Sequence, residues 1–241
     1  MNAMKVLRKS LPLALCLALF GVSAAASAFT ISQIGTSGGN PGGQPLYEVA
    51  GLIEGDAFNL DWGGVTGLDI TGMLTVDTLT STGVQLSIML DNNSTPIGVN
   101  GDPRVTSFGL NINGFTGLND TATGGTFLDL ADTSNFPGFT TTTCATSGTN
   151  CAGGASGGID AGLSDAFLLD VAGSFGGSPT LTLSGFAVKV QGGPSGASFE
   201  LAGIPTEKTP NGGVPAPTVL GLLGIGLAAL GFTGRVRRRT N

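Results

Sequence analysis

The amino-acid sequence predicts an all-β protein, a two-sheet antiparallel β-sandwich of jelly-roll-like type that lies between two apolar terminal segments. Three observations carry this prediction. Apolar and polar residues alternate along several short runs, which is typical of strands buried on one face. Glycine accounts for 42 of the 241 residues and supplies turns between such runs. Between residues 29 and 213, no segment of adequate length has the period of an amphipathic helix. Together these features favour two packed sheets.

The clearest alternation runs through residues 68–77, where the apolar side chains and one glycine share one parity and the polar ones mostly take the other. Residues 84–90 repeat this pattern, and the Thr-Ser-Thr-Gly segment at residues 80–83 predicts a hairpin turn between the two runs. Residues 108–112 and 167–171 alternate in the same way. Each of these four runs is therefore expected to be a half-buried antiparallel strand.

Six further segments are expected to be strands, with these bounds: 30–34, 46–53, 57–62, 126–131, 180–191 and 198–202. Within the fifth of them the apolar parity shifts at Gly185, which predicts a β-bulge there. The folded domain is expected to cover residues 29–205. Residues 206–213 contain little apolar surface to pack and predict a linker.

The N-terminus has the three parts of a secretory signal peptide at residues 1–28. Basic residues come first, an apolar core follows at residues 11–22, and small residues at Ala26 and Ala28 form a cleavage site. We therefore expect the mature chain to begin at Phe29.

The last segment, residues 214–241, contains three elements in a fixed order. An uncharged apolar run at residues 218–234 would reach about 25 Å as a helix, the short end of a membrane span. Arginines behind the run would stay in the cytoplasm, because positive flanks resist translocation. The motif before the run is Val214, Pro215, Ala216 and Pro217, and the basic residues after it are Arg235, Arg237, Arg238 and Arg239.

This ordered set resembles the PEP-CTERM sorting signal of Gram-negative bacteria, in which Val-Pro-Glu-Pro precedes a Gly-rich apolar helix and an arginine cluster. Val214, Pro215 and Pro217 match that motif, and Ala216 stands where the family usually has Glu. The resemblance covers 28 of the 241 residues. The alternative for the same segment is a plain C-terminal membrane anchor that contains two prolines by accident.

The resemblance implies a protein that is acted upon and is not itself an enzyme. An exosortase would process it near residues 214–217, after Sec-dependent export and transient anchoring in the inner membrane. The final location would be the cell surface or the extracellular medium. The family is produced together with exopolysaccharide, so a role in biofilm and exopolysaccharide as a partner are expected.

Charge is distributed unevenly along the chain. All 16 acidic residues lie between residues 29 and 213, where only Arg104, Lys189 and Lys208 oppose them. Removal of both terminal segments therefore changes the net charge from −6 to −13. Such an acidic domain repels nucleic acid and anionic lipid headgroups, so no nucleic-acid partner is expected.

Two cysteines remain after removal of the signal peptide. Cys144 and Cys151 lie in a Thr-, Ser- and Gly-rich segment at residues 140–158, which is expected to be a loop. In an oxidising periplasm they are expected to form a disulfide that contributes on the order of 2 kcal/mol. A zinc site is the alternative, but zinc takes four ligands and the chain contains no histidine.

The absence of histidine also excludes Ser-His-Asp and Cys-His catalysis, and we predict no catalytic residue and no cofactor. A glycosidase would need two carboxylates across a cleft. The nearest candidates in sequence are Glu48, Glu54, Asp56 and Asp61.

A calcium- or glycan-binding sandwich is the alternative function. Oxygen-rich turns could supply ligands to a structural calcium, although Asn and Asp also favour turns for their own hydrogen bonds. Trp62 could stack on a sugar, although a single Trp at a strand end is usually part of a core. The turns lie at residues 91–94, 111–114, 119–120 and 129–132.

Overall fold

A computed structural model describes residues 29–96, 101–118, 123–127, 129–131, 136–148, 151–152, 157–193 and 196–207. The predicted signal peptide and the predicted C-terminal sorting segment lie outside these residues. The same holds for the expected sites Ala26 and Ala28, for the motif at residues 214–217 and for the arginines at residues 235–239. Among the described residues, no helix has both the length and the apolar character needed to cross a membrane.

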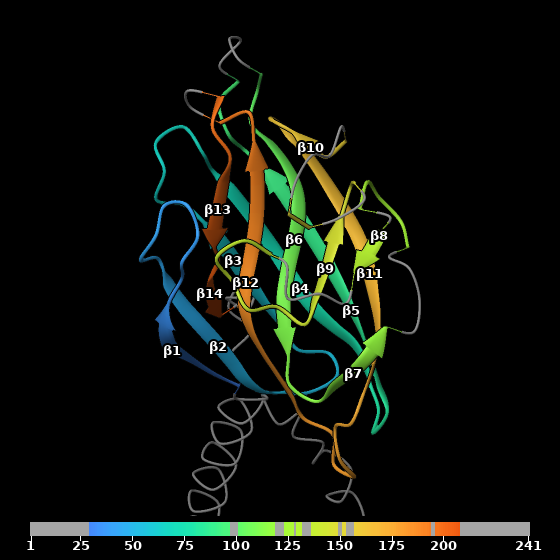
Figure 1. The fold of residues 1–241 in the computed structure, drawn as a ribbon. Helices are drawn as coiled ribbons and strands as arrows, with labels where there is room; N and C mark the ends of the chain where they lie inside the picture. Colours follow the sequence, from blue (N-terminus) through green and yellow to red (C-terminus); the bar gives the residue numbers. More distant parts are fainter. Residues whose placement is uncertain are drawn as a thin grey trace, which may run out of the picture. The chain divides into compact units, whose positions relative to one another are not determined.

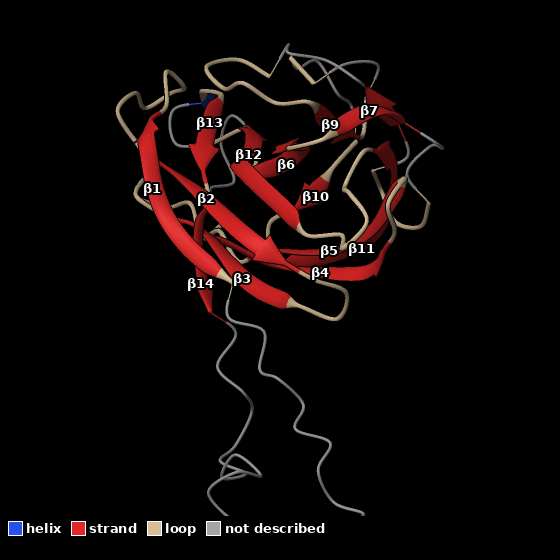
Figure 2. Ribbon diagram, turned by 90° about the horizontal axis from the view of Figure 1, so that it is seen from below, coloured by secondary structure: helices blue, strands red, loops and turns tan. Residues whose placement is uncertain are grey.

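The described chain forms two antiparallel β-sheets that pack as a sandwich (Figures 1 and 2). One sheet has eight strands, in the order β1-β2-β12-β6-β9-β8, with β13 paired to β12 and β10 paired to β6. The other has six strands, in the order β14-β3-β4-β5-β11-β7. The described strands are β1 (Thr30–Thr36), β2 (Pro45–Leu52), β3 (Ala57–Trp62), β4 (Ile70–Leu79), β5 (Gly83–Asn92), β6 (Arg104–Ile112), β7 (Phe115–Leu118), β8 (Asp129–Ala131), β9 (Thr143–Thr146), β10 (Ile159–Asp160), β11 (Leu163–Gly173), β12 (Leu181–Gln191), β13 (Phe199–Ala202) and β14 (Ile204–Glu207).

The predicted hairpin between β4 and β5 is confirmed. The two strands pair in antiparallel register, and the backbone N–H of Thr80 donates to the carbonyl of Gly83 at 2.9 Å. Gly72 lies on the buried face of β4, where a Cβ atom would come within 2.6 Å of the carbonyl oxygen of Met89. A glycine is therefore required by this close approach of two backbones.

The core between the sheets is apolar and rich in aromatic rings. Trp62 is fully buried, stands edge-on to Phe108 with ring centroids 6.1 Å apart, and donates from Nε1 to the carbonyl of Phe186 at 3.3 Å. Phe58 and Phe186 make a similar edge-to-face contact at 5.5 Å. These rings extend from β3 in one sheet to β6 and β12 in the other, so they hold the two sheets face to face.

The predicted bulge at Gly185 is also confirmed. The register between β12 and β6 shifts between Ser184 and Ala187, and Gly185 has φ of +64°. A left-handed backbone of this kind favours glycine. The bulge changes which side of β12 faces the core, so that Leu183 and Phe186 both point inward.

The outer face of the eight-stranded sheet carries a second, smaller apolar cluster. Its members are Phe136, Phe139, Cys144, Cys151, Ala187 and Ala202. From Ser184 to Val190, every residue of β12 is buried, so this strand is covered on both faces. Residues 136–140, which lie outside the sheet, contribute to this cover through Phe136, Phe139 and the carbonyl of Thr140.

Four of the described strands were not expected from the sequence, namely β7, β9, β10 and β14. Residues 140–158 were predicted to be a loop, but Thr143–Thr146 form β9, which pairs with both β6 and β8. All four residues of β9 are buried, so the polar–apolar alternation that reveals a half-buried strand is missing. The other three, β7, β10 and β14, have four, two and four residues and are too short to give a periodic signal.

Several predicted boundaries also need correction. The linker was expected to begin at residue 206, yet Thr206 and Glu207 belong to β14, which pairs with β3 along its full length. Pro205 is tolerated because β14 is an edge strand. The strand expected at residues 126–131 is found only at Asp129–Ala131, because Thr126 lies in a bend and its N–H bonds to Asp165.

Candidate functional site

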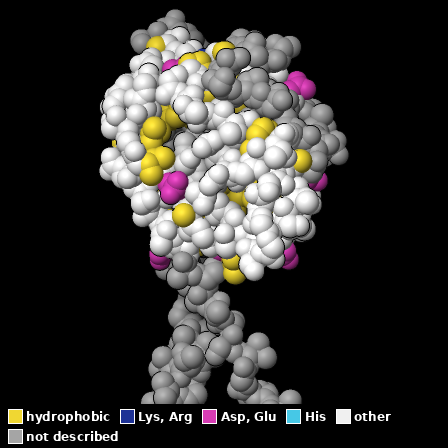
Figure 3. Space-filling view, turned by 60° about the horizontal axis from the view of Figure 1, so that its bottom comes forward, with side chains coloured by type: hydrophobic (Ala, Val, Ile, Leu, Met, Phe, Trp, Pro, Cys, Tyr) yellow, Lys and Arg dark blue, Asp and Glu magenta, His cyan; other side chains and the backbone are white. Residues whose placement is uncertain are grey.

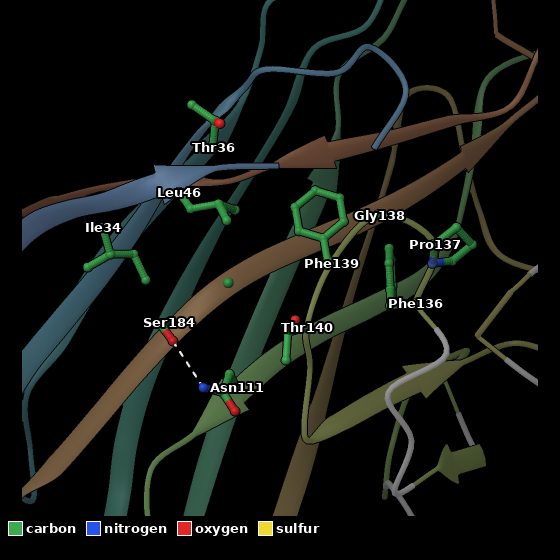
Figure 4. A pocket seen from close by; sticks show the side chains of 11 residues that line it. Ile34, Thr36, Leu46, Asn111, Phe136, Pro137, Gly138, Phe139, Thr140 and Ser184 are labelled. Carbon is green, nitrogen blue, oxygen red and sulfur yellow. Dashed lines mark hydrogen bonds between the residues drawn. The ribbon is translucent and has the colours of Figure 1, made fainter. Parts of the chain in front are cut away.

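A groove of about 690 Å³ opens on the outer face of the eight-stranded sheet (Figure 4). Five parts of the fold form it: β1 and β2 on one side, β6 and β12 beneath, and residues 136–140 on the other side. We call residues 136–140 the strap. The lining residues are Ile34, Thr36, Leu46, Asn111, Phe136, Pro137, Gly138, Phe139, Thr140, Ser184 and Gly185.

Close backbone packing fixes the strap in place. The N–H of Gly38 donates to the carbonyl of Gly138 at 3.0 Å, and the N–H of Phe139 donates to the carbonyl of Phe136 at 3.1 Å. Gly138 has φ of +76°, and a side chain there would collide with the backbone of Gly39. A Cβ atom on Gly39 would come within 2.7 Å of the carbonyl of Glu200. The strap and the loop after β1 can approach so closely only because both carry glycines.

The rings of the strap rest on a row of small residues in the sheet. Across β13, β12, β6 and β9, the paired residues are Ala202, Ala187, Gly109 and Cys144. A Cβ atom on Gly109 would lie 2.7 Å from Cδ2 of Phe136, so the ring occupies the space above this glycine. Phe136 and Phe139 also stack edge-to-face on each other at 5.8 Å. The strap is thus anchored by aromatic packing.

The floor of the groove is polar and is shaped by the β12 bulge. Nδ2 of Asn111 in β6 donates to Oγ of Ser184 in β12 at 3.3 Å (Figure 4). Beside them Gly185 presents bare backbone, and a Cβ atom there would lie 3.2 Å from the carbonyl oxygen of Thr140. The floor therefore offers an amide, a hydroxyl and peptide groups.

The lining residues carry no charged group. Ile34, Leu46 and Phe139 give apolar contacts, while Thr36, Asn111, Thr140 and Ser184 give neutral hydrogen-bonding groups. The nearest carboxylate by strand register is that of Glu48, which pairs with Ser184 across β2 and β12 but is not among the lining residues. The described lining residues therefore offer neutral hydrogen-bonding groups and apolar contacts.

A buried ion pair lies further along the same face of the sheet. Nζ of Lys189 in β12 is 3.1 Å from Oε1 of Glu200 in β13, and the two side chains are only 7% and 11% exposed. Nζ also donates to the carbonyl of Ala152. The ammonium group therefore ties the segment after Cys151 to the sheet, which is a structural use of a buried charge.

The disulfide predicted between Cys144 and Cys151 is present, with Cα atoms 6.4 Å apart. This separation lies within the usual range for a bridged pair. Cys144 belongs to β9, so the bridge attaches Cys151 to the sheet. Both cysteines are members of the second apolar cluster. Phe29, the expected first residue of the mature chain, precedes β1 and packs against the main core.

The carboxylates considered for a glycosidase do not gather into one site. Glu54 accepts from the N–H of Leu79 at 3.4 Å, and Asp56 accepts from the N–H of Ile53 at 2.9 Å, so both brace the turn between β2 and β3. Glu48 and Asp61 belong to different sheets. Trp62, considered for sugar stacking, is fully buried in the core and cannot reach a ligand.

The oxygen-rich turn at residues 91–94 is used by the fold itself. Nδ2 of Asn92 donates to the carbonyls of Pro103 and Ile159 at 2.9 and 2.8 Å, and its Oδ1 accepts from the N–H of Ser94. Among the described residues, no group of three or more acidic or cysteine side chains could hold a metal ion. Residues 119–120 and 132, from two other turns, lie outside the described chain, and calcium binding stays a prediction.

No protein-family model, no curated protein and no solved structure matches this chain. The candidate site is therefore defined by its geometry. Sequence reasoning did not identify the groove, because its lining residues come from parts of the chain that only the sheet order brings together. One local signal was present, since the parity shift at Gly185 marks the bulge in its floor.

Proposed function

We propose that this chain is an exported, exosortase-processed protein of the cell surface or extracellular matrix, associated with exopolysaccharide and biofilm and without enzymatic activity. The observation that carries the proposal is the order of elements after the last strand. Six residues follow Glu207, and then come the Val-Pro-Ala-Pro motif, an uncharged apolar run and four arginines. A short tether between a folded domain and a processing motif leaves that motif accessible to an enzyme at the membrane.

Two properties of the sandwich support an extracytoplasmic location. A disulfide between Cys144 and Cys151 suits an oxidising compartment. Both basic residues of the described sandwich, Arg104 and Lys189, are paired with carboxylates, so acidic side chains dominate its electrostatics. On the face drawn in Figure 3 the acidic side chains are dispersed singly among uncharged ones. Such a surface favours solubility and disfavours binding to nucleic acid.

The proposed route has three stages. The signal peptide directs Sec-dependent export and is removed before Phe29. The apolar run at residues 218–234 then holds the protein transiently in the inner membrane, with its arginines in the cytoplasm. An exosortase acts near residues 214–217, and the sandwich passes to the cell surface or the medium.

Intact-mass measurement of the exported protein tests this route. In a host with an active exosortase, we expect a product that begins at Phe29 and lacks the basic tail. In a host without exosortase, the tail should remain and the protein should stay in the membrane fraction. Exchanging both Pro215 and Pro217 for Ala should leave insertion intact but slow processing, because a stiff extended segment is what an enzyme would recognise.

Pro210→Ala is the matched control, since it removes a proline from the same tether outside the motif. If the double proline variant were processed at the normal rate, the plain C-terminal anchor would replace the sorting signal. Exchange of the four arginines for Gln should weaken membrane retention and block recognition, because positive residues fix the orientation of the apolar run.

A binding module is the second candidate, and the groove beside the strap is the observation that favours it. The jelly-roll-like form expected from the sequence belongs to this proposal, because lectin domains are among the sandwiches of that type. Of the two ligands considered, a glycan is favoured over calcium. The side chain of Asn92, in the oxygen-rich turn, is hydrogen-bonded to Pro103 and Ile159, whereas the groove offers several neutral hydrogen-bonding groups on one face of the sheet.

A further inference from the structure

We propose that the groove beside the strap binds an uncharged segment of a polysaccharide. This deepens the binding role proposed above and does not depend on how the tail is processed. The inference rests on three features of the groove: its lack of charge within an acidic domain, the separation of its apolar and polar surfaces, and its fixed shape.

The charge distribution selects a neutral ligand. An anionic ligand would be repelled by a domain whose net charge is −13 between residues 29 and 213. A cation would prefer a cluster of carboxylates, but none of the described residues that line the groove is acidic. An uncharged ligand is not repelled by the negative charge of the domain. Its hydrogen bonds to the groove would replace those it makes with water.

The two surfaces of the groove match the two surfaces of a sugar ring. Ile34, Leu46 and Phe139 present an apolar wall, while Asn111 and Ser184 form the polar floor (Figure 4). A pyranose ring has C–H groups on its faces and hydroxyl groups at its edge, so it needs both kinds of contact at once. Oδ1 of Asn111 can accept a hydrogen bond from such a hydroxyl group, and the hydroxyl of Thr140 can donate or accept one. The volume lies within the range of ligand pockets.

The groove needs little rearrangement to bind. Gly138 and Gly39 lock the strap against the loop after β1, and Phe136 fills the space above Gly109. A wall held in this way loses little conformational freedom when a ligand arrives, which lowers the cost of binding.

An extended peptide is the competing occupant. A peptide would bind by adding a strand to an open sheet edge, and β1 is the edge strand nearest to the groove. The register of β1 with β2 shifts between Gln33 and Gly35, beside the lining residues Ile34 and Thr36. A bulge at that position disrupts the regular hydrogen-bond pattern that an added strand needs. The geometry therefore favours the saccharide.

Isothermal titration of the purified exported protein tests the proposal with defined probes. These are cellohexaose, laminarihexaose and maltohexaose as neutral oligosaccharides, a hexamer of galacturonic acid as the anionic one, and an acetylated, amidated Thr-Ala hexapeptide. We expect at least one neutral oligosaccharide to bind and the anionic hexamer to bind at least tenfold more weakly. If no neutral oligosaccharide binds, or if only the peptide binds, the proposal is wrong.

Two pairs of variants locate the site. Ile34→Glu places a charge on the apolar wall, and Ile53→Glu makes the same change at another exposed isoleucine, the two being 52% and 41% exposed. Asn111→Asp places a charge on the floor, and Asn113→Asp makes it in the exposed turn nearby. We expect the groove variants to weaken binding at least fivefold and the controls to stay within twofold.

Equal effects of a groove variant and its control would overturn the proposal. Because Ile34 is exposed, Ile34→Glu remains a valid test even if Asn111→Asp disturbs folding, which circular dichroism would reveal. If the binding test fails, the proposed export route is not contradicted, because intact mass measures tail processing independently of any ligand.

Discussion

The ring of Phe29 packs on the ring of Phe58 in β3, with centroids 6.1 Å apart and planes inclined at 55°. Phe58 also pairs with Glu207 across β3 and β14. Phe29 and Glu207, the first and the last described residues of the sandwich, therefore both lie beside the same residue of β3.

Substitution of Phe29 by Ala should destabilise the exported protein by about 1 to 2 kcal/mol, because it removes an aromatic pair and partly buried apolar area. Denaturant unfolding followed by fluorescence of Trp62 would measure the change. Leu163→Ala is the control, since Leu163 is 57% exposed and its loss should cost less than about 0.5 kcal/mol. Equal losses would mean that Phe29 does not pack on Phe58 in solution.

Peptide mapping of exported material without reductant should yield Cys144 joined to Cys151. Replacement of both cysteines by Ser should lower the free energy of unfolding by about 2 kcal/mol, because the cross-link restricts the unfolded chain. Two freely alkylated thiols in the native protein would contradict the bonded pair. The reduced wild-type protein is the control, since it should match the double variant in stability.

Lys189→Met should destabilise the protein by about 3 kcal/mol or more, because it leaves the Glu200 carboxylate buried without its partner. The double variant Lys189→Met with Glu200→Gln should recover part of that loss, since no buried charge remains. Arg104→Gln provides the comparison, because the Arg104–Asp160 pair is 38% and 51% exposed and should contribute at most about 1 kcal/mol. Thermal unfolding of the wild type, Lys189→Met, Glu200→Gln and the double variant measures the coupling between the two residues.

Gly109→Ala should destabilise the protein by about 1 to 2 kcal/mol, because the added methyl group meets the ring of Phe136 and forces the strap outward. Gly117→Ala in β7 is the matched control. A Cβ atom there meets nothing within 4 Å, so this change should be neutral or slightly stabilising. If both substitutions had the same effect, the close contact between the strap and the sheet would be absent in solution.

Half-buried strands could be predicted from the sequence, because apolar and polar residues must alternate along a strand that has one face in the core and one in solvent. The six-stranded sheet shows this clearly in β4 and β5, where buried and half-buried residues take turns. The bulge at Gly185 was readable for the same reason, since a change of parity within one strand needs an extra residue.

The rest of the fold lacked such a signal. Strand β9 is buried on both faces under residues that pack from outside the sheet, so its sequence Thr-Cys-Ala-Thr resembles a loop. The groove depends on the contact between Asn111 and Ser184, which are 73 positions apart. It also depends on the close packing of Gly138 on Gly39 and of Phe136 on Gly109. No local pattern encodes that kind of pairing.

The position of β12 has a consequence for the order of events during folding. This strand joins β2 to β6 in the middle of the eight-stranded sheet, yet it begins at Leu181, more than a hundred residues after β2. Contacts between such distant segments close large loops, which makes folding slow. Until the last third of the domain has been synthesised, β2 and β6 have no strand between them. The eight-stranded sheet therefore cannot be completed until β12 has been synthesised, whereas β3, β4 and β5 of the other sheet are consecutive in the chain.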